Sequence, residues 1–374
     1  MACAQYKMFL NGQAATTQQL DSFETITVEQ EMDHSWVAHL EIPLCTNAQG
    51  DWTGETESWL QPLSRLRIEL SLGGSYVPLI DGSIVSANYD MHMEPGQSVL
   101  KLEVQDDGFL LHRDESVHLF AGITDAQIAD RIFRHSPDIA TRDIDLDPVD
   151  APSDLSDNTT VLRGTQMELL QKLAGRQHMQ MHAYVLPGSQ SHRSIGCFKK
   201  DPEGDSGLPP MVLLGKGRNV VNIHFANSAS EPAVYRTRRV SLSDAKINSA
   251  TANLSDLTRD GTDPPGGTAV KRLLRPGQSW SVDLDRSVLT ASEEAAYALQ
   301  ADGEVLKDVY CAILTPYQNV QVLGANGRQS GLWLIRQVTH TLTRNSYGQT
   351  FSLKRNAESA GTGNSSPGIP ASVF

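Results

Sequence analysis

The sequence lacks the patterns that place a chain in a membrane or in an oxidising compartment. No stretch approaches the roughly 18 apolar residues of a transmembrane helix, and the start, MACAQYKMFLNGQ, has no basic region followed by an apolar run, so no secretory signal is expected. Cysteine is scarce, and no C-x-x-C pair occurs, which argues against a disulfide framework or a zinc ribbon. We therefore expect synthesis in a reducing cytoplasm. The cysteines are Cys3, Cys45, Cys197 and Cys311.

Positive charge is also in short supply. The 374 residues include 31 Lys and Arg against 44 Asp and Glu, which gives a net charge of -13 at pH 7. An acidic surface repels phosphate, so a basic nucleic-acid footprint is not expected. The charge either serves solubility or forms the acidic wall of a channel that does not hold DNA, and the sequence leaves both interpretations open.

Recognisable catalytic and cofactor-binding motifs are missing as well. The glycine-rich stretches at 215–217 (GKG) and 324–327 (GANG) lack the Lys-Thr/Ser and the helix of a phosphate loop, so they are predicted to be turns. No G-x-S-x-G nucleophile elbow occurs. The 44 acidic residues could include a pair of carboxylates that hydrolyses glycosides, but no such pair stands out in the sequence. We therefore expect a non-enzyme without cofactors, and assign no catalytic, cofactor-binding or metal-binding residue.

Two groups come nearest to a metal site. His178 and His182 have i, i+4 spacing, but they fall on an alternating segment that predicts a strand, without the carboxylate of an H-E-x-x-H motif. The acidic run DIDLDPVD at 143–150 could bind calcium, yet it lacks the glycine and the terminal glutamate of an EF-hand. A solvated acidic loop explains this run better.

The chain is long enough for two or three domains, and its 39% hydrophobic and 20% charged residues are typical of a globular protein. Residues 1–107 consist of short alternating runs separated by glycine turns, which predicts a first β-barrel domain. Residues 208–357 predict a second one, although its strands at 211–226 could instead pack with the first barrel. Residues 249–280 are predicted to be a long exposed loop, and residues 358–374 a flexible tail.

Residues 108–207 predict an α+β middle domain because the apolar period changes there to that of helices. Two capping boxes precede apolar stripes, so a helix is expected to begin at each of them. They are formed by Thr124 with Gln127 and by Thr165 with Glu168. The first helix should end by Ser136, before a proline. A third capping box, Thr290 with Glu293, predicts a helix inside the second barrel domain.

The segment 330–356, SGLWLIRQVTHTLTRNSYGQTFSLKRN, predicts a hairpin near the end of the chain. Its first strand places Leu332, Leu334, Val338 and Leu342 on one face and Trp333 and Ile335 on the other, which indicates burial on both sides. His340 shares the first face and is interpreted as a structural histidine with its hydrogen bonds satisfied, not as a ligand.

Three segments together resemble one protein family. The segments VQDDGFLLHRDESVHLFAGITDAQIADRIFRHS (104–136) and VLRGTQMELLQKLAGRQHMQMHAYV (161–185) are similar to the central part of phage tail baseplate hub proteins of the late-control D and Mu type. These proteins are related to the N-terminal hub part of VgrG spike proteins. The hairpin is similar to their C-terminal pattern through Gly331, Val338, His340, Gly348, Thr350, Phe351, Leu353 and Arg355. In the segment 161–185 the chain departs from the family's helix pattern: Gln166 and Met167 stand where the family often has Asp-Trp, and Leu169 replaces its aromatic residue.

The resemblance implies a homotrimer in which each chain supplies two similar β-barrel domains, so that three chains form a ring with pseudo-six-fold symmetry. Such a hollow adaptor would join a hexameric tail tube to a trimeric central spike, contact the tape-measure protein and let DNA pass without specific binding. It would belong to the virion tail baseplate and assemble in the host cytoplasm.

If each chain supplies two similar barrel domains, its sequence should contain an internal repeat. Residues 79–105 and 332–356 share an alternating strand, a polar turn and a second alternating strand, with Gly96-Gln97 placed parallel to Gly348-Gln349. The alternatives are the hub of a contractile injection system, a glycan-binding β-rich surface protein and a baseplate cell-wall hydrolase.

Overall fold

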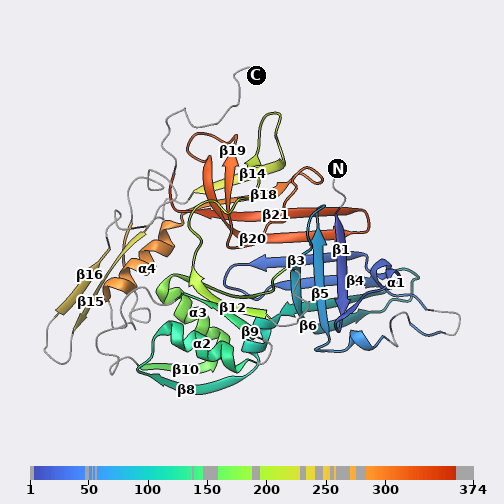
Figure 1. Cartoon of the computed structure of the whole chain (residues 1–374), viewed down its shortest axis with the longest axis horizontal. Coiled ribbons are helices and arrows are strands. Elements are labelled where there is room, and N and C mark those ends of the chain that lie inside the picture. Colours follow the sequence, from blue (N-terminus) through green and yellow to red (C-terminus); the bar gives the residue numbers. More distant parts are fainter. Residues whose placement is uncertain are drawn as a thin grey trace.

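A 13-stranded sheet dominates the computed structural model and crosses the molecule in Figure 1. The structure describes residues 4–46, 50–52, 54, 57–136, 139–145, 159–187, 194–227, 233–240, 247–252, 257, 270–274 and 284–358. The mainly β class predicted from the sequence is confirmed. The strands of this sheet are β1 (Gln5–Leu10), β2 (Gln13–Ala14), β3 (Thr25–Glu31), β4 (Val37–Pro43), β5 (Arg65–Ser71), β6 (Val77–Asp90), β7 (Val99–Asp106), β13 (Met211–Val212), β14 (Val220–Asn227), β18 (Leu299–Val305), β19 (Asn319–Leu323), β20 (Gly331–Thr343) and β21 (Ser346–Arg355).

The sheet joins the two halves of the chain. Its strand order is β14-β18-β21-β20-β3-β4-β7-β6-β5-β1-β2, and the described strands form an open path rather than two separately closed barrels. The long strand β20 joins the two halves because it pairs with a strand of each. Its first residues pair with β19, while Gln337 to Thr343 pair antiparallel with β3, and a register irregularity near Arg336 separates the two parts.

Two hydrophobic cores lie under the two halves of this sheet. In β3, β4 and β7, alternation buries every second side chain, because successive residues of a strand point to opposite faces. In the first half, Val28 and Leu40 are completely buried. In the second half, Trp333 and Ile335 are buried on one side of β20 and Leu334 on the other, as predicted. Val338 was expected on the face of Leu334, but the register irregularity near Arg336 places it with Trp333 and Ile335. Strands β13 and β14 pair with β19 and β18, so residues 211–226 belong to the second core.

The middle of the chain forms a small α+β unit, at the bottom of Figure 1. Both predicted capping boxes are present: Thr124 caps α2 (Asp125–His135), which ends at Ser136, and Thr165 caps α3 (Gln166–Gln177). The apolar stripes of both helices pack on Phe198 and the surrounding core. The other elements are η2 (Asp107–His112), β8 (Glu115–Ala121), β9 (Ile139–Ile144), β10 (Thr159–Thr165), β11 (Met179–Tyr184) and β12 (Ser194–Lys200).

Three local predictions differ from the structure. The third helix, α4 (Leu284–Ala296), starts well before Thr290, whose side chain is buried inside the helix and does not cap it. Strands β16 (Ile247–Thr251) and β17 (Val270–Leu273) reach into the predicted loop 249–280 and pair with β15 (Ala233–Val240). Two short helices, α1 (Thr17–Ser22) and η1 (Ser58–Leu60), interrupt the strands of the first half.

The two hairpins thought to be repeats share a design but not the proposed alignment. Both β6–β7 and β20–β21 have a long first strand with one register irregularity. Gly96 and Gln97 lie in an exposed turn, however, whereas Gly348 and Gln349 lie inside β21, with Gln349 buried. The Gly-Gln parallel drawn from the sequence is therefore wrong.

Gly82 in β6 tests how tightly the first hairpin is packed. A Cβ atom at this position would lie 1.9 Å from the carbonyl oxygen of Gln105 and 2.9 Å from the Cα of Asp106, both backbone atoms. We expect Gly82→Ala to lower the free energy of unfolding by about 3 kcal/mol, because the β7 backbone has to move. Urea denaturation measures this. Gly74→Ala is the control, since open space surrounds Gly74, and equal midpoints for the two variants would contradict the prediction.

Candidate functional surface

One face of the large sheet is polar and continuous across both halves of the chain. We call it the polar sheet face. Alternation turns the apolar side chains of β3, β4 and β7 into the first core and leaves their other side chains outside. The same holds for β18, β20 and β21 over the second core. The face consists of Thr25, Thr27, Glu29, Glu31, His39, Glu41, Asp90, Lys101, Glu103, Gln105, Gln300, Asp302, Glu304, Gln337, Thr339, Thr341, Thr343, Thr350, Ser352 and Lys354.

Negative charge prevails on the polar sheet face. Glu31 accepts a hydrogen bond from Arg336 at 2.9 Å, and Asp90 forms an ion pair with Lys101 at 3.0 Å. Glu29 and Asp302 form no ion pair within the part of the chain that the structure describes, and both are exposed. Hydroxyl and amide groups fill most of the remaining positions. Such a surface is well hydrated and repels anions.

The join between the two halves is hydrogen-bonded through His340. Gln30 donates from Nε2 to the Leu79 carbonyl oxygen at 2.7 Å, so its Oε1 faces His340 Nε2 at 3.3 Å. That nitrogen must therefore carry the proton, and Nδ1 accepts from the Tyr347 hydroxyl at 2.8 Å. Burial lowers the pKa of His340 to about 3. The prediction of a satisfied structural histidine is confirmed.

A second junction ties the middle unit to both halves through Asp33. Asp33 lies in the β3–β4 turn with a φ of 61°, and its Oδ1 accepts from the Tyr317 hydroxyl at 2.9 Å and from the Met181 amide at 3.2 Å. The Asp33 carbonyl oxygen accepts from Gln171 Nε2 at 2.9 Å. Burial raises the pKa of Asp33. No sequence motif marks these contacts, because they join segments far apart in the chain.

The two histidines with metal-like spacing are not brought together. His178 is not on a strand: it is the left-handed C-cap of α3, and its ring stacks on Tyr297. His182 lies on β11 and stacks on Tyr317 with ring centroids 4.3 Å apart. Burial lowers the pKa of His178 to about 4 and that of His182 to about 3. Across the described ranges, no group of three His, Cys, Asp or Glu side chains is arranged to hold a metal ion.

The remaining sequence candidates have structural explanations. Residues 215–217 and 324–327 are turns, as predicted. At the start of the acidic run, Asp143 accepts hydrogen bonds from Lys199 Nζ at 2.5 Å and from the Tyr184 hydroxyl at 3.2 Å, while residues 146–150 lie outside the described residues. No helix within the described ranges is both long and apolar enough to cross a membrane.

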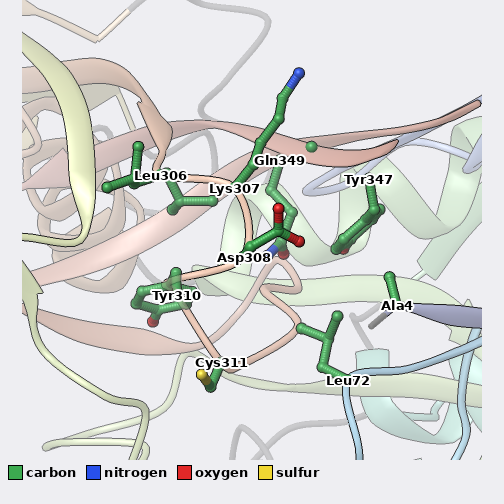
Figure 2. Close-up of a pocket in the computed structure, with 11 residues that line it drawn as sticks. Ala4, Leu72, Leu306, Lys307, Asp308, Tyr310, Cys311, Tyr347 and Gln349 are labelled. Carbon is green, nitrogen blue, oxygen red and sulfur yellow. The ribbon is translucent and has the colours of Figure 1, made fainter. Parts of the chain in front are cut away.

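Two cavities are lined by residues that the structure describes. Figure 2 shows a crevice of about 20 Å³ where Ala4 and Leu72 of the first half meet Tyr347 and Gln349 of the second half. It has room for a single water molecule. A larger cavity of about 350 Å³ lies between α3, α4 and residues 200–204, where cations and carboxylates are mixed without a nucleophile and base in contact.

Comparisons with known proteins match the fold of the chain to solved structures. No family model and no curated protein sequence matches the chain. Among solved structures, it is similar to the 43 kDa tail protein of prophage MuSo2 from Shewanella oneidensis, with a TM-score of 0.59 and 13% identity, over 95% of this chain and 97% of that one. A tail protein from Neisseria meningitidis MC58 matches with a TM-score of 0.57 and 13% identity, over 94% of this chain and 96% of that one.

A secretion component has the same fold. An Escherichia coli protein described as a component of the type VI secretion system, with structural similarity to the T4 bacteriophage tail proteins gp27 and gp5, gives a TM-score of 0.56 and 11% identity over 89% of this chain and 73% of that one. At these identities the likeness shows the fold. The chain therefore has the fold of phage tail proteins, as the sequence resemblance predicted.

Proposed function

We infer that the chain is a structural, non-catalytic hub subunit of a phage tail baseplate. Three copies form a hollow ring that joins the tail tube to the central spike, contacts the tape-measure protein and lets DNA pass during genome ejection. The complex is part of the virion tail and is assembled in the host cytoplasm. The proposal combines the tail-protein fold with the polar sheet face, which is the observation that carries it.

The polar sheet face has the chemistry of a channel wall. Threonine, glutamine and serine side chains keep the surface hydrated, and the excess of carboxylates repels a phosphate backbone. Because β20 pairs with β3, this wall continues from one half of each subunit to the other. Three copies of two tube-like halves give the pseudo-six-fold ring that matches a hexameric tube.

The domain division proposed with this function follows the cores. Residues 1–107 form the first tube-like domain, residues 108–207 the middle domain and residues 208–357 the second tube-like domain. Each contains its own hydrophobic cluster. The shared hairpin design supports an origin of the two tube-like domains by duplication.

Assembly provides the direct test. Sedimentation of the purified chain, alone and with the spike encoded beside its gene, should give the mass of three copies, and electron microscopy should show a ring with a central hole. A monomer or dimer without a hole under both conditions would contradict the proposal. Binding to a glycan array would support a surface glycan-binding protein instead, and clearing of a peptidoglycan gel a cell-wall hydrolase.

Charge reversal on the polar sheet face tests the channel role. We expect the double variant Glu29→Lys/Asp302→Lys to slow DNA ejection at low salt, because the added cations hold phosphate, with the defect fading as salt rises. The salt slope of DNA binding by the purified variant should steepen by about one for each phosphate that an added lysine neutralises. The neutral variant Glu29→Gln/Asp302→Asn is the control. Unchanged ejection in correctly assembled particles would contradict the channel assignment.

A contractile injection system is the second candidate. The similarity to the Escherichia coli type VI secretion component favours it, since the same hub chemistry serves both machines. Neighbouring capsid and tape-measure genes would identify a phage, and effector genes with a sheath ATPase would identify an injection system.

A further inference from the structure

The sheet β16-β15-β17 concentrates positive charge in an acidic chain. Its strands read INSAT, AVYRTRRV and VKRL, and they contain no Asp or Glu. The chain as a whole has 44 acidic and 31 basic residues, so a carboxylate-free sheet with this many cations departs from the rest of the surface. Together with α4, β15 and β16 form a lobe at the left of Figure 1. The cations are Arg236, Arg238, Arg239, Lys271 and Arg272.

One face of this sheet is covered by α4. The Tyr235 amide donates to Ser292 Oγ of α4 at 3.0 Å, and Ala250 and Leu274 pack with Val288. Ala233 and Thr237 of β15 are buried on the α4 side, whereas Arg236 and Arg238, which alternate with them, are exposed on the opposite face. The buried side is a small core of its own, and the opposite face has no described element packed against it.

The opposite face, here called the basic sheet face, combines cations with exposed aliphatic side chains. The register places Arg236 opposite Leu273 of β17 and Arg238 opposite Ser249 of β16. Lys271 lies two residues before Leu273 on β17, so the two side chains share a face. Ile247 likewise lies two residues before Ser249 on β16 and shares its face. Leu273 is 67% exposed and Ile247 68%. The basic sheet face consists of Arg236, Arg238, Ile247, Lys271 and Leu273.

These cations have no counter-charge within the described part of the chain. Arg236, Arg238 and Lys271 are exposed and form no ion pair with a described carboxylate. Arginine beside large exposed aliphatic residues is typical of protein interfaces. The basic sheet face has no aromatic side chain on which a nucleic-acid base could stack. The chemistry that fits it is an acidic polypeptide containing aliphatic residues.

Residues 146–157, LDPVDAPSDLSD, have this chemistry. Their sequence interleaves Asp147, Asp150, Asp154 and Asp157 with Leu146, Val149 and Leu155, and contains no Lys, Arg or His. This segment lies outside the described residues. We propose that the basic sheet face binds segment 146–157 of a neighbouring copy of the chain, an inference that rests on the trimer proposed above. A contact between two different surfaces of identical subunits is the kind that closes a ring.

Peptide binding tests the recognition. A fluorescent peptide of residues 146–157, titrated with the full-length protein at low salt, should bind with an affinity that Arg236→Glu/Arg238→Glu lowers about tenfold. The control Lys216→Glu/Arg218→Glu makes the same change in charge in the exposed β13–β14 turn and should leave binding unchanged. An equal loss of peptide affinity in both variants would overturn the proposal. It would also be overturned if a single-stranded DNA of equal charge bound more strongly than the peptide and its binding depended on Arg236 and Arg238.

Cysteine pairing tests whether the segment comes from a neighbouring copy. With Cys3, Cys45 and Cys311 replaced by serine and only buried Cys197 kept, a chain with Leu273→Cys is mixed with one carrying Leu155→Cys and oxidised. A disulfide between chains supports the proposal. A disulfide formed only within one chain, in the variant carrying both cysteines, overturns it. If Arg236→Glu/Arg238→Glu trimerises like the wild type, this interface is wrong and the trimer stands, whereas a wild type that never trimerises refutes both.

Discussion

Replacing Arg65 by methionine is expected to destabilise the protein by about 3–5 kcal/mol, because buried Asp107 loses its paired cation and buried Asp81 keeps only Arg67, 3.5 Å away. Arg65 binds Asp107 through both terminal nitrogens at 2.7 and 2.8 Å, and its Nε donates to Asp81 at 2.7 Å. The side chains of both aspartates are completely buried, and that of Arg65 is 16% exposed. Ser194 of the middle unit donates to Asp107 as well, so the network also anchors β12.

The measurement is urea denaturation monitored by tryptophan fluorescence, with Lys101→Met as the matched control. Lys101 pairs with Asp90 on the exposed sheet face, where water screens the charges, so its loss should leave the midpoint unchanged. Arg65→Lys should fall between the wild type and Arg65→Met, because lysine keeps the charge but cannot bind Asp107 with two nitrogens. Equal midpoints for Arg65→Met and Lys101→Met would refute the importance of the network.

Acid is expected to weaken the join between the halves through His340. The pKa of His340 is about 3 in the folded chain, below the ordinary value of about 6.5 in an unfolded one. The unfolded chain therefore takes up the proton first, and the stability supplied by neutral His340 is lost as the pH falls below about 6.5. Over two pH units this loss is about 3 kcal/mol.

His340→Gln removes this titration. The difference in unfolding free energy between the wild type and this variant should shrink by about 3 kcal/mol between pH 6.5 and pH 4.5. Other groups contribute equally to both proteins, including Asp106, whose pKa burial raises to about 7, and their contributions cancel. Tyr347→Phe removes the hydrogen bond to Nδ1 but keeps the imidazole, so it should retain the wild-type pH dependence. A difference that is constant with pH would contradict the prediction.

Local signals predicted the local parts of the fold. The capping boxes of Thr124 and Thr165 are complete within four residues, so the sequence alone places the starts of α2 and α3. Thr290 carries the same pattern, but tertiary packing extends α4 past it and buries the hydroxyl. Alternation likewise predicted burial on both sides of the first part of β20, because a period of two needs no partner strand to be recognised. It did not predict the irregularity near Arg336, which places Val338 with Ile335 instead of with Leu334.

The functional surface required information that no local pattern contains. Separate barrels were expected because each half has its own alternating strands, and nothing in β20 indicates that its second part pairs with β3. The Asp33–Tyr317 contact and the cation-rich sheet similarly join residues that are distant in sequence or that lie in a predicted loop. The tail-protein resemblance was recoverable because three ordered motifs, each modest alone, occur together.

The pairing of β20 with β3 also sets when the protein can finish folding. Arg336 and Glu31, which are bonded across this join, are separated by 305 residues. A nascent chain can build the first core while it is being synthesised, but β3 stays an unpaired sheet edge until β20 has left the ribosome. Contacts of such long range make folding slow, and the exposed edge is open to pairing with other chains meanwhile. The fold is therefore complete only after β20 has been synthesised, and truncation before residue 337 is expected to leave an aggregation-prone sheet rather than a smaller subunit.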